Sequence, residues 1–232
     1  MKDFAYFVGV ILPPITVAVF IGAIAYRLLR WWKLPNPSLT LFPAPEPGAD
    51  AFRGVLKATF FFPSLLKADK LLWGAAWVFH GALALVLLGH LRVVTDFPRI
   101  WNALGINPDV MSSVIGGLAG IIMLIAVLFL ILRRLFIPRV REITQAGDYF
   151  AVLLLLGIIV TGDLMRFSGH FDLEQTREYF GGLILLQLSL PPLNSWFLMH
   201  FLLGQTLFLY LPFSKLLHFG GIFFTQTALQ RR

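Results

Sequence analysis

Residues 77–94 read WVFHGALALVLLGHLRVV, an apolar run that contains two histidines, His80 and His90. A stretch of about 20 apolar residues is long enough to cross the ~30 Å hydrocarbon core of a bilayer as a helix. An imidazole inside such a helix is costly unless it finds a partner, so ionisable residues there point to a functional site. The run therefore predicts a membrane-spanning helix with a site at its two histidines.

The whole chain has the composition of a membrane protein. Of its 232 residues, 58% are hydrophobic and only 13% are charged, whereas soluble domains carry about 25% charged residues. The formal charge of +7 does not indicate a nucleic-acid partner, because the basic residues cluster between apolar stretches. Since the chain has no cysteine, it forms no disulfide and holds no thiolate metal site or iron–sulfur cluster.

Five apolar stretches are long enough to span a membrane. Backbone polar groups in lipid must be satisfied within the segment, so these stretches are expected to be helices. We predict an all-α integral membrane bundle, one domain over residues 1–232, with five transmembrane helices at about 4–29, 71–94, 112–132, 149–166 and 195–218. Pro13 and Pro14 are expected to kink the first helix, and Pro212 the last.

The basic residues predict how the chain is oriented. Fourteen of the nineteen Lys and Arg residues lie in segments 30–70 and 133–148, in the C-terminal tail or at the adjoining helix ends. Segments rich in Lys and Arg stay in the cytoplasm. We therefore expect the N-terminus outside, the C-terminus in the cytoplasm, and a multi-pass protein of the cytoplasmic (inner) membrane.

By this orientation, segment 34–70 is a cytoplasmic loop. Its proline-rich part LPNPSLTLFPAPEPGADAF (34–52) is expected to be irregular or extended. Its second part, FRGVLKATFFFPSLLKADK (52–70), mixes aromatic residues with lysines. This mixture is typical of an amphipathic helix on the membrane surface, and it is equally compatible with a docking site for a cytoplasmic partner.

Four of the five histidines fall in two predicted helices, His80 and His90 in the second, His200 and His218 in the fifth. At ~100° and 1.5 Å per residue, His200 and His218 face the same way about 27 Å apart, and His80 and His90 lie about 15 Å apart. These two helices run antiparallel. We therefore expect an inner pair, His80 with His218, and an outer pair, His90 with His200. Helix tilt and a kink in the last helix must absorb the unequal spacings.

Pairs of histidines in a helix bundle suit haem iron. Zinc normally takes four ligands, whereas two histidines fill both axial positions of a haem, which then carries electrons only. We therefore predict two haem b groups with the four histidines as iron ligands. Gly81, Gly89 and Gly204 lie beside these histidines or one turn away and would let a flat macrocycle approach. Helix–helix packing favours glycine equally well.

The spacings of ten and eighteen residues, on the second and last of five helices, resemble the di-haem cytochrome b (gamma) subunit of respiratory nitrate reductase. The stretches LRRLFIPRVREITQAGDY (132–149) and TLFLYLPFSKLLHF (206–219) are similar to that family's third cytoplasmic loop and final helix. The resemblance covers roughly residues 71–222.

Two departures favour one branch of this family. The nitrate reductase branch has a short first cytoplasmic loop, whereas this chain carries the insert 34–70. That branch also has a lysine about twenty residues beyond its second histidine, where this chain has Asp109, Val110 and Met111. The insert and the phrase FFPSLLKADKLLWGAAWVFHG look more like the membrane cytochrome of the DsrMKJOP complex of sulfur metabolism. A gamma subunit of nitrate reductase stays the alternative.

The resemblance implies electron transfer between a membrane quinone, menaquinone, and a cytoplasmic iron–sulfur protein related to heterodisulfide reductase. Quinol would bind near the outer haem, and further membrane and external subunits are expected. Electron transfer in the opposite direction, which reduces quinone, would use the same haems.

Quinol oxidation needs a proton acceptor, for which Asp163 is the candidate; pairing with Arg166 is its alternative role.

Arg92 and Arg166 are candidates to bind the propionates of the outer haem and Lys215 those of the inner one, because Arg suits carboxylates. All three are equally well explained as interfacial anchors. His170, in an outer loop, is expected to be an exposed histidine.

A second class of function is a transporter or proton channel with a histidine relay. Such a protein would carry further acidic residues in its spans and broken helices at the midplane. Only Asp163 fits this pattern, and it lies near a helix end. A purely structural anchor would leave four intramembrane histidines without a role.

Overall fold

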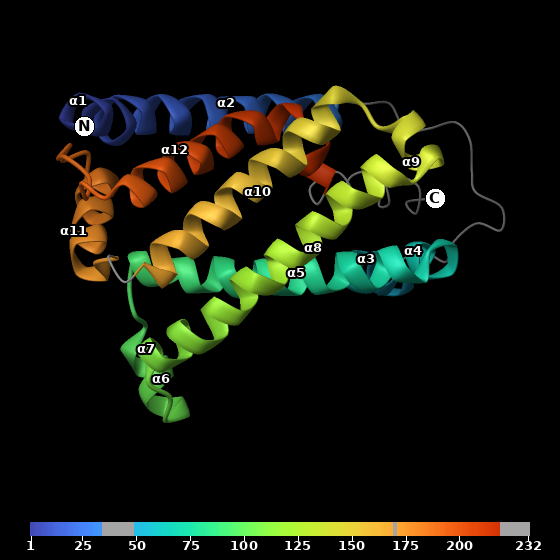
Figure 1. The fold of residues 1–232 in the computed structure, drawn as a ribbon, viewed down its shortest axis with the longest axis horizontal. Helices are drawn as coiled ribbons and strands as arrows, with labels where there is room; N and C mark the ends of the chain where they lie inside the picture. The colour runs from blue at the N-terminus through green and yellow to red at the C-terminus, as the bar shows by residue number, and fades with distance from the viewer. Residues whose placement is uncertain (34–48, 169–170, 219–232) are drawn as a thin grey trace. The chain divides into compact units, whose positions relative to one another are not determined.

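The computed structural model describes residues 1–33, 49–168 and 171–218, where all regular elements are helical (Figure 1). Five helical stretches are long and apolar enough to cross a membrane, namely Lys2–Trp32, Lys70–Val93, Pro108–Phe136, Ala146–Phe167 and Ser195–Phe213. This confirms the predicted all-α fold with five membrane spans. The orientation of the termini stays a prediction.

The spans are built from α-helices with short irregular turns at their ends. They consist of α1 (Lys2–Tyr6), a π-helix η1 (Phe7–Ile11) and α2 (Leu12–Trp32); α5 (Lys70–His90) and η2 (Leu91–Val93); α7 (Pro108–Met111), a π-helix η3 (Ser112–Gly116) and α8 (Gly117–Phe136); α10 (Ala146–Phe167); and α12 (Ser195–Tyr210) with η4 (Leu211–Phe213). Shorter helices connect or follow them: α3 (Ala49–Phe61), α4 (Pro63–Ala68), α6 (Pro98–Leu104), α9 (Pro138–Ile143), α11 (Leu173–Ile184) and η5 (Lys215–Leu217).

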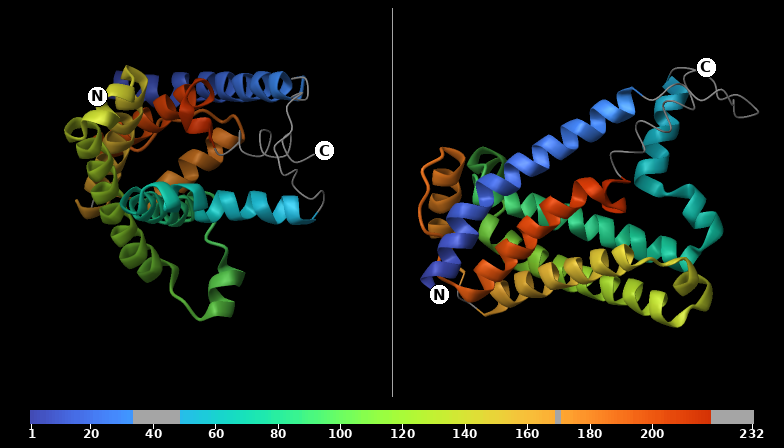
Figure 2. Two further views of the ribbon diagram at one scale, coloured as in Figure 1. Left: turned by 90° about the vertical axis from the view of Figure 1, so that its right-hand side faces the viewer. Right: turned by 90° about the horizontal axis from the view of Figure 1, so that it is seen from above.

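The chain falls into two compact units. Unit 1 comprises Met1–Thr16 and Val78–Leu207, and unit 2 comprises Val17–Trp77 and Phe208–Arg232. In unit 1, helices α8 and α10 run side by side in every view (Figures 1 and 2). One apolar core of this unit joins residues of α5, α8 and α10, namely Phe79, Ala82, Ala119, Met123, Ala126, Val127 and Ile159.

In the first span, a π-helix lies just before the two prolines, Pro13 and Pro14. The N–H of Leu12 bonds to the carbonyl of Phe7, so the carbonyl of Val8 would next need an N–H from Pro13, which has none. The carbonyl of Gly9 faces Pro13 or Pro14 and is equally short of a donor. Side chains of other helices supply both bonds.

These donors come from α11 and α12. The Tyr179 hydroxyl donates to the Gly9 carbonyl at 2.6 Å, and Gln205 Nε2 donates to the Val8 carbonyl at 2.9 Å, all at buried positions. Thr16 Oγ1 in turn donates to Gln205 Oε1 at 3.4 Å. Prolines within a membrane helix are tolerated when neighbouring groups satisfy the freed carbonyls in this way.

The last span is shorter than predicted. Helix α12 ends at Tyr210, and residues 211–218 continue as two 3₁₀ turns separated by the extended residue Ser214. The predicted continuous helix over 195–218 is therefore wrong at its C-terminal end. Pro212 is the cause, because it lacks an N–H and disfavours α geometry in the residue before it.

In unit 2, the helix expected within residues 52–70 is present as α3 and α4. The indole N–H of Trp73 on α5 donates to the carbonyl of Phe61 at 2.7 Å, which ties the end of α3 to the start of the second span. Phe20 and Phe208 meet edge to face with ring centroids 4.9 Å apart. The place of α3 on a membrane surface or against a partner stays a prediction, and residues 34–48 lie outside the described ranges.

Candidate functional site

The outer pair of histidines comes together inside unit 1. His90 is the last residue of α5, and His200 lies in the second turn of α12. Their imidazole ring centroids are 6.0 Å apart, and the ring planes differ by 21°. The structure thus places two near-parallel imidazoles from different helices opposite each other, in the combination that the sequence predicts.

Both imidazoles of the outer pair are held through Nδ1. His90 Nδ1 lies 2.7 Å from the carbonyl oxygen of Val86, and His200 Nδ1 lies 3.0 Å from that of Ile158. A carbonyl oxygen only accepts, so each Nδ1 carries the proton in the neutral imidazole. The lone pair of each ring is then on Nε2, which is the atom available to a metal.

Helix α10 supplies the surroundings of His200. Thr161, buried with 7% of its surface exposed, places Oγ1 at 3.2 Å from His200 Nδ1. A Cβ atom added to Gly162 would lie only 3.0 Å from His200 Cε1. The sequence analysis did not select either residue, although a hydroxyl next to a glycine within an apolar span was the signal available.

The two histidines of the inner pair belong to different units. His80, in unit 1, meets the ring of Phe79 edge to face with centroids 5.4 Å apart. His218, in unit 2, is exposed, and its Nδ1 lies 3.2 Å from the carbonyl oxygen of Lys215. His218 follows the 3₁₀ turn η5 and does not continue α12, so the predicted five-turn spacing from His200 does not hold. The pairing of His80 with His218 stays a prediction.

The glycines predicted beside the histidines leave open space. A Cβ atom added to Gly81, Gly89 or Gly204 would meet no other described atom within 4 Å. Such space suits a flat macrocycle, and Gly22 and Gly74 are equally open. Within the described ranges, no group of three or more His, Cys, Asp or Glu side chains gathers as a metal-ion site.

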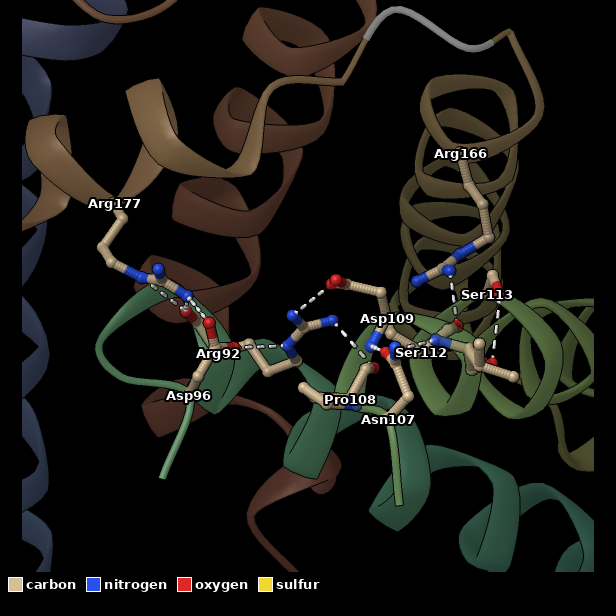
Figure 3. A network of polar contacts seen from close by, with 10 residues as sticks. Arg92, Asp96, Asn107, Pro108, Asp109, Ser112, Ser113, Arg166 and Arg177 are labelled. Atoms are coloured by element: carbon tan, nitrogen blue, oxygen red, sulfur yellow. Dashed lines mark hydrogen bonds and ion pairs between the residues drawn. The ribbon is translucent and has the colours of Figure 1, made fainter. Parts of the chain in front are cut away.

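Arg92, two residues after His90, is buried in a polar network (Figure 3). Its guanidinium donates to Asp96 at 2.6 Å, to Asp109 at 2.7 Å and to the carbonyl of Pro108 at 3.0 Å. Arg177 of α11 donates to Asp96 at 2.7 Å and to the Arg92 carbonyl at 2.8 Å. The network joins the end of α5 to α7 and α11, so Arg92 already has two carboxylate partners.

The same network shifts the titration of Asp96. The hydrogen bond from Arg92 lowers the pKa of Asp96 below its ordinary value, helped by Arg177 and partly opposed by burial. Asp96 is therefore an anion that the fold stabilises.

Asp163 and Arg166 contact different residues. Arg166 donates to the carbonyl of Ser112 at 2.7 Å (Figure 3). The Asp163 carboxylate packs against Gly120 of α8, and its Oδ2 is buried without a hydrogen-bond partner among the described residues. No hydrogen bond joins these two side chains among the described residues, although the positive charge of Arg166 acts on the Asp163 carboxylate. Lys215 is exposed at the start of η5, and His170 lies outside the described ranges.

Comparison with known proteins places the chain in a family. Residues 62–230, well over half of the chain, match the family described as the nitrate reductase gamma subunit. The chain belongs to this family. A curated relative from Archaeoglobus fulgidus, named the Hdr-like menaquinol oxidoreductase cytochrome b-like subunit, is 31% identical over 94% of this chain and 78% of the relative.

Two further relatives cover most of the chain. The protein of the same name from Archaeoglobus profundus is 27% identical over 96% of this chain and 78% of the relative. The nitrate reductase gamma chain of Bacillus subtilis is 27% identical over 90% of this chain and 87% of the relative. With the five spans, these similarities establish a multi-pass membrane subunit of the cytochrome b type, with a role in electron transfer and other subunits beside it.

Proposed function

We propose that this chain is the di-haem cytochrome b subunit of a quinone-linked complex of the cytoplasmic membrane. It would pass electrons between menaquinol and a cytoplasmic iron–sulfur subunit related to heterodisulfide reductase, in sulfur or sulfite metabolism. The observation that carries this proposal is the outer pair: two imidazoles on different helices, each with Nδ1 bonded to a carbonyl.

Four histidines would hold two haems. His90 and His200 would ligate the outer haem, and His80 and His218 the inner one. Two histidine ligands leave haem iron no position for oxygen or substrate, so such a haem supplies single-electron transfer. The protein's part is to fix the imidazoles, and three of the four have Nδ1 on a backbone carbonyl, that of Val86, Ile158 or Lys215. A metal-ligating histidine typically uses its second nitrogen in this way.

Asp163 is our candidate for the group that accepts a proton from quinol. The oxidation of quinol releases protons, so a base must lie within reach of the substrate. Asp163 Oδ2 is buried and has no hydrogen-bond partner among the described residues, while Arg166 is engaged by Ser112. An Oδ2 atom that accepts no hydrogen bond from a described residue is available to take up a proton.

The relatives support the choice of substrate and branch. Two of them carry menaquinol oxidoreductase in their names, and they match 94% and 96% of this chain, against 90% for the Bacillus subtilis gamma chain. Because the chain has no cysteine, an iron–sulfur cluster that takes electrons from it must be held by another subunit.

The direct test is an absorption spectrum and a haem count on the purified, dithionite-reduced protein. We expect the α band of haem b and two haems per chain. A protein without this band would overturn the proposal, and a count of one haem would overturn its di-haem form.

Single replacements test which histidines act together. His200→Ala is expected to remove the outer haem and leave the inner one, so the count falls from two to one. His170→Ala is the matched control, because it removes the fifth histidine, which we assign to no haem, and should leave two. Loss of both haems or of neither in His200→Ala would contradict the pairing.

A further inference from the structure

We propose that Thr161 and Gly162 of α10 are positioning residues for the outer haem. Thr161 is a second acceptor for the Nδ1 proton of His200, beside the carbonyl of Ile158, and Gly162 leaves room for the ring. This inference rests on the proposed function, since it takes His200 as an iron ligand. Neither residue would touch the iron; both act through His200.

The hydrogen bonds of Thr161 decide the direction of its contact with His200. The hydroxyl has one proton, which it donates to the carbonyl of Gly157 at 2.7 Å or of Ile158 at 3.1 Å. Its oxygen is then left as an acceptor at 3.2 Å from His200 Nδ1. Because Thr161 is buried, water does not readily replace it in this role.

His200 therefore meets two acceptors on one side of its ring. The carbonyl of Ile158 lies at 3.0 Å and the Thr161 hydroxyl oxygen at 3.2 Å from the same Nδ1 atom. Two acceptors require the proton on Nδ1, which leaves Nε2 unprotonated and able to bind iron. All three groups of α10 that take part lie within one turn, so this helix alone sets the tautomer.

Gly162 makes room for the ring on the adjacent position of α10. An added Cβ would lie 3.0 Å from His200 Cε1 and 3.3 Å from Nδ1, so alanine would require the imidazole to move by a few tenths of an ångström. The Asp163 carboxylate next in sequence packs instead against Gly120 of α8. Two successive residues of α10 thus face different helices: Gly162 faces α12 and Asp163 faces α8.

The expected consequence is electronic as well as structural. A hydrogen bond accepted from Nδ1–H raises the basicity of the ligating imidazole, and it orients the ring. A more basic ligand favours the oxidised iron. Removal of the Thr161 oxygen should therefore raise the midpoint potential of the outer haem and leave that of the inner haem unchanged.

Thr161→Val tests the hydroxyl with little change in shape. We expect a positive shift of one of the two midpoint potentials in a redox titration, and a changed EPR spectrum of that oxidised haem. We also expect that haem to be lost about 10- to 100-fold more readily, the usual effect of removing such a partner. Thr161→Ser keeps the oxygen and should restore the wild-type values.

The matched control is Thr206→Val on α12. Thr206 Oγ1 donates to the carbonyl of Leu202 at 2.9 Å, so this change removes an equivalent helix hydroxyl in the span that carries His200. It should leave both potentials unchanged. Should Thr161→Val not assemble, Gly162→Ala keeps the hydroxyl and should alter the EPR spectrum by displacing the ring.

Several outcomes would overturn the inference while the proposed function stands. Wild-type potentials and EPR spectra in both Thr161→Val and Gly162→Ala would do so, as would an equal shift in Thr206→Val. A wild-type protein that contains no haem would instead overturn the proposed function.

Discussion

At the scale of the residue, hydrogen bonds to backbone carbonyls orient the side chains of the site. Each of His90, His200 and His218 turns Nδ1 to a carbonyl oxygen, in two cases within its own stretch of helix and in the third on α10. Arg177 likewise donates to a carbonyl, that of Arg92. In a chain with so few polar side chains, the backbone is the main acceptor available.

The network around Asp96 predicts a loss of stability in acid. Its pKa lies below the ordinary value of 3.8, so the carboxylate stabilises the fold above that pH and ceases to do so as the pH falls through the folded-state pKa. Asp96→Asn should lower stability by about 1 kcal/mol near pH 6, allowing for solvent screening. Thermal unfolding in detergent at pH 3–6 measures this difference, which should shrink toward pH 3.

Glu178→Gln is the control for this prediction. Glu178 is an exposed carboxylate on α11. Its replacement should change the free energy of unfolding by no more than about 0.5 kcal/mol, the usual range for surface substitutions. A difference between Asp96→Asn and wild type that stayed constant down to pH 3 would show that Asp96 acts through packing and not through its charge.

At the scale of the element, prolines decide where helices change and which side chains must compensate. Pro13 and Pro14 free two carbonyls of the first span, and Tyr179 and Gln205 occupy them. Pro212 instead ends α12, since the chain after it turns away as 3₁₀. The same residue type thus lies within a continued helix in the first span and just after a helix end in the last.

Tyr179→Phe should destabilise the protein by about 1–2 kcal/mol, because it leaves the buried Gly9 carbonyl without a donor. The unfolding temperature in detergent is the measurement. Tyr6→Phe, at a side chain that is 51% exposed, is the matched control and should change little. Equal effects of the two replacements would mean that the bond from Tyr179 contributes nothing.

Hydropathy predicts the spans well because their length is imposed by the bilayer, and all five are found where expected. The end of α12 at Tyr210 was missed because a proline kink and a proline end look alike in sequence. Thr161 was missed because its role depends on which face of α10 meets His200, and a single sequence does not reveal helix rotation. The contact of Arg166 with the carbonyl of Ser112 was not predicted, because a sequence does not show which backbone carbonyls lie within reach of an arginine.

At the scale of the whole molecule, the proposed function requires a direction across the membrane. Electrons can reach a cytoplasmic partner only if the inner pair faces the cytoplasm, and that placement depends on the positive-inside rule. The connection between α8 and α10 carries Arg139 and Arg141, and the connection between α10 and α12 carries Arg177 within α11. These two connections must lie on opposite sides of the membrane because one span separates them.

The orientation can be tested with single cysteines, because the chain has none of its own and a thiol reagent can label it only at the introduced position. Glu142→Cys in α9 and Glu174→Cys in α11 replace exposed glutamates on the two connections. We expect an impermeant maleimide to label Glu174→Cys in intact cells and Glu142→Cys only after the membrane is opened. The reverse pattern would place the outer pair on the cytoplasmic side of the membrane, and the direction of electron transfer proposed above would then be wrong.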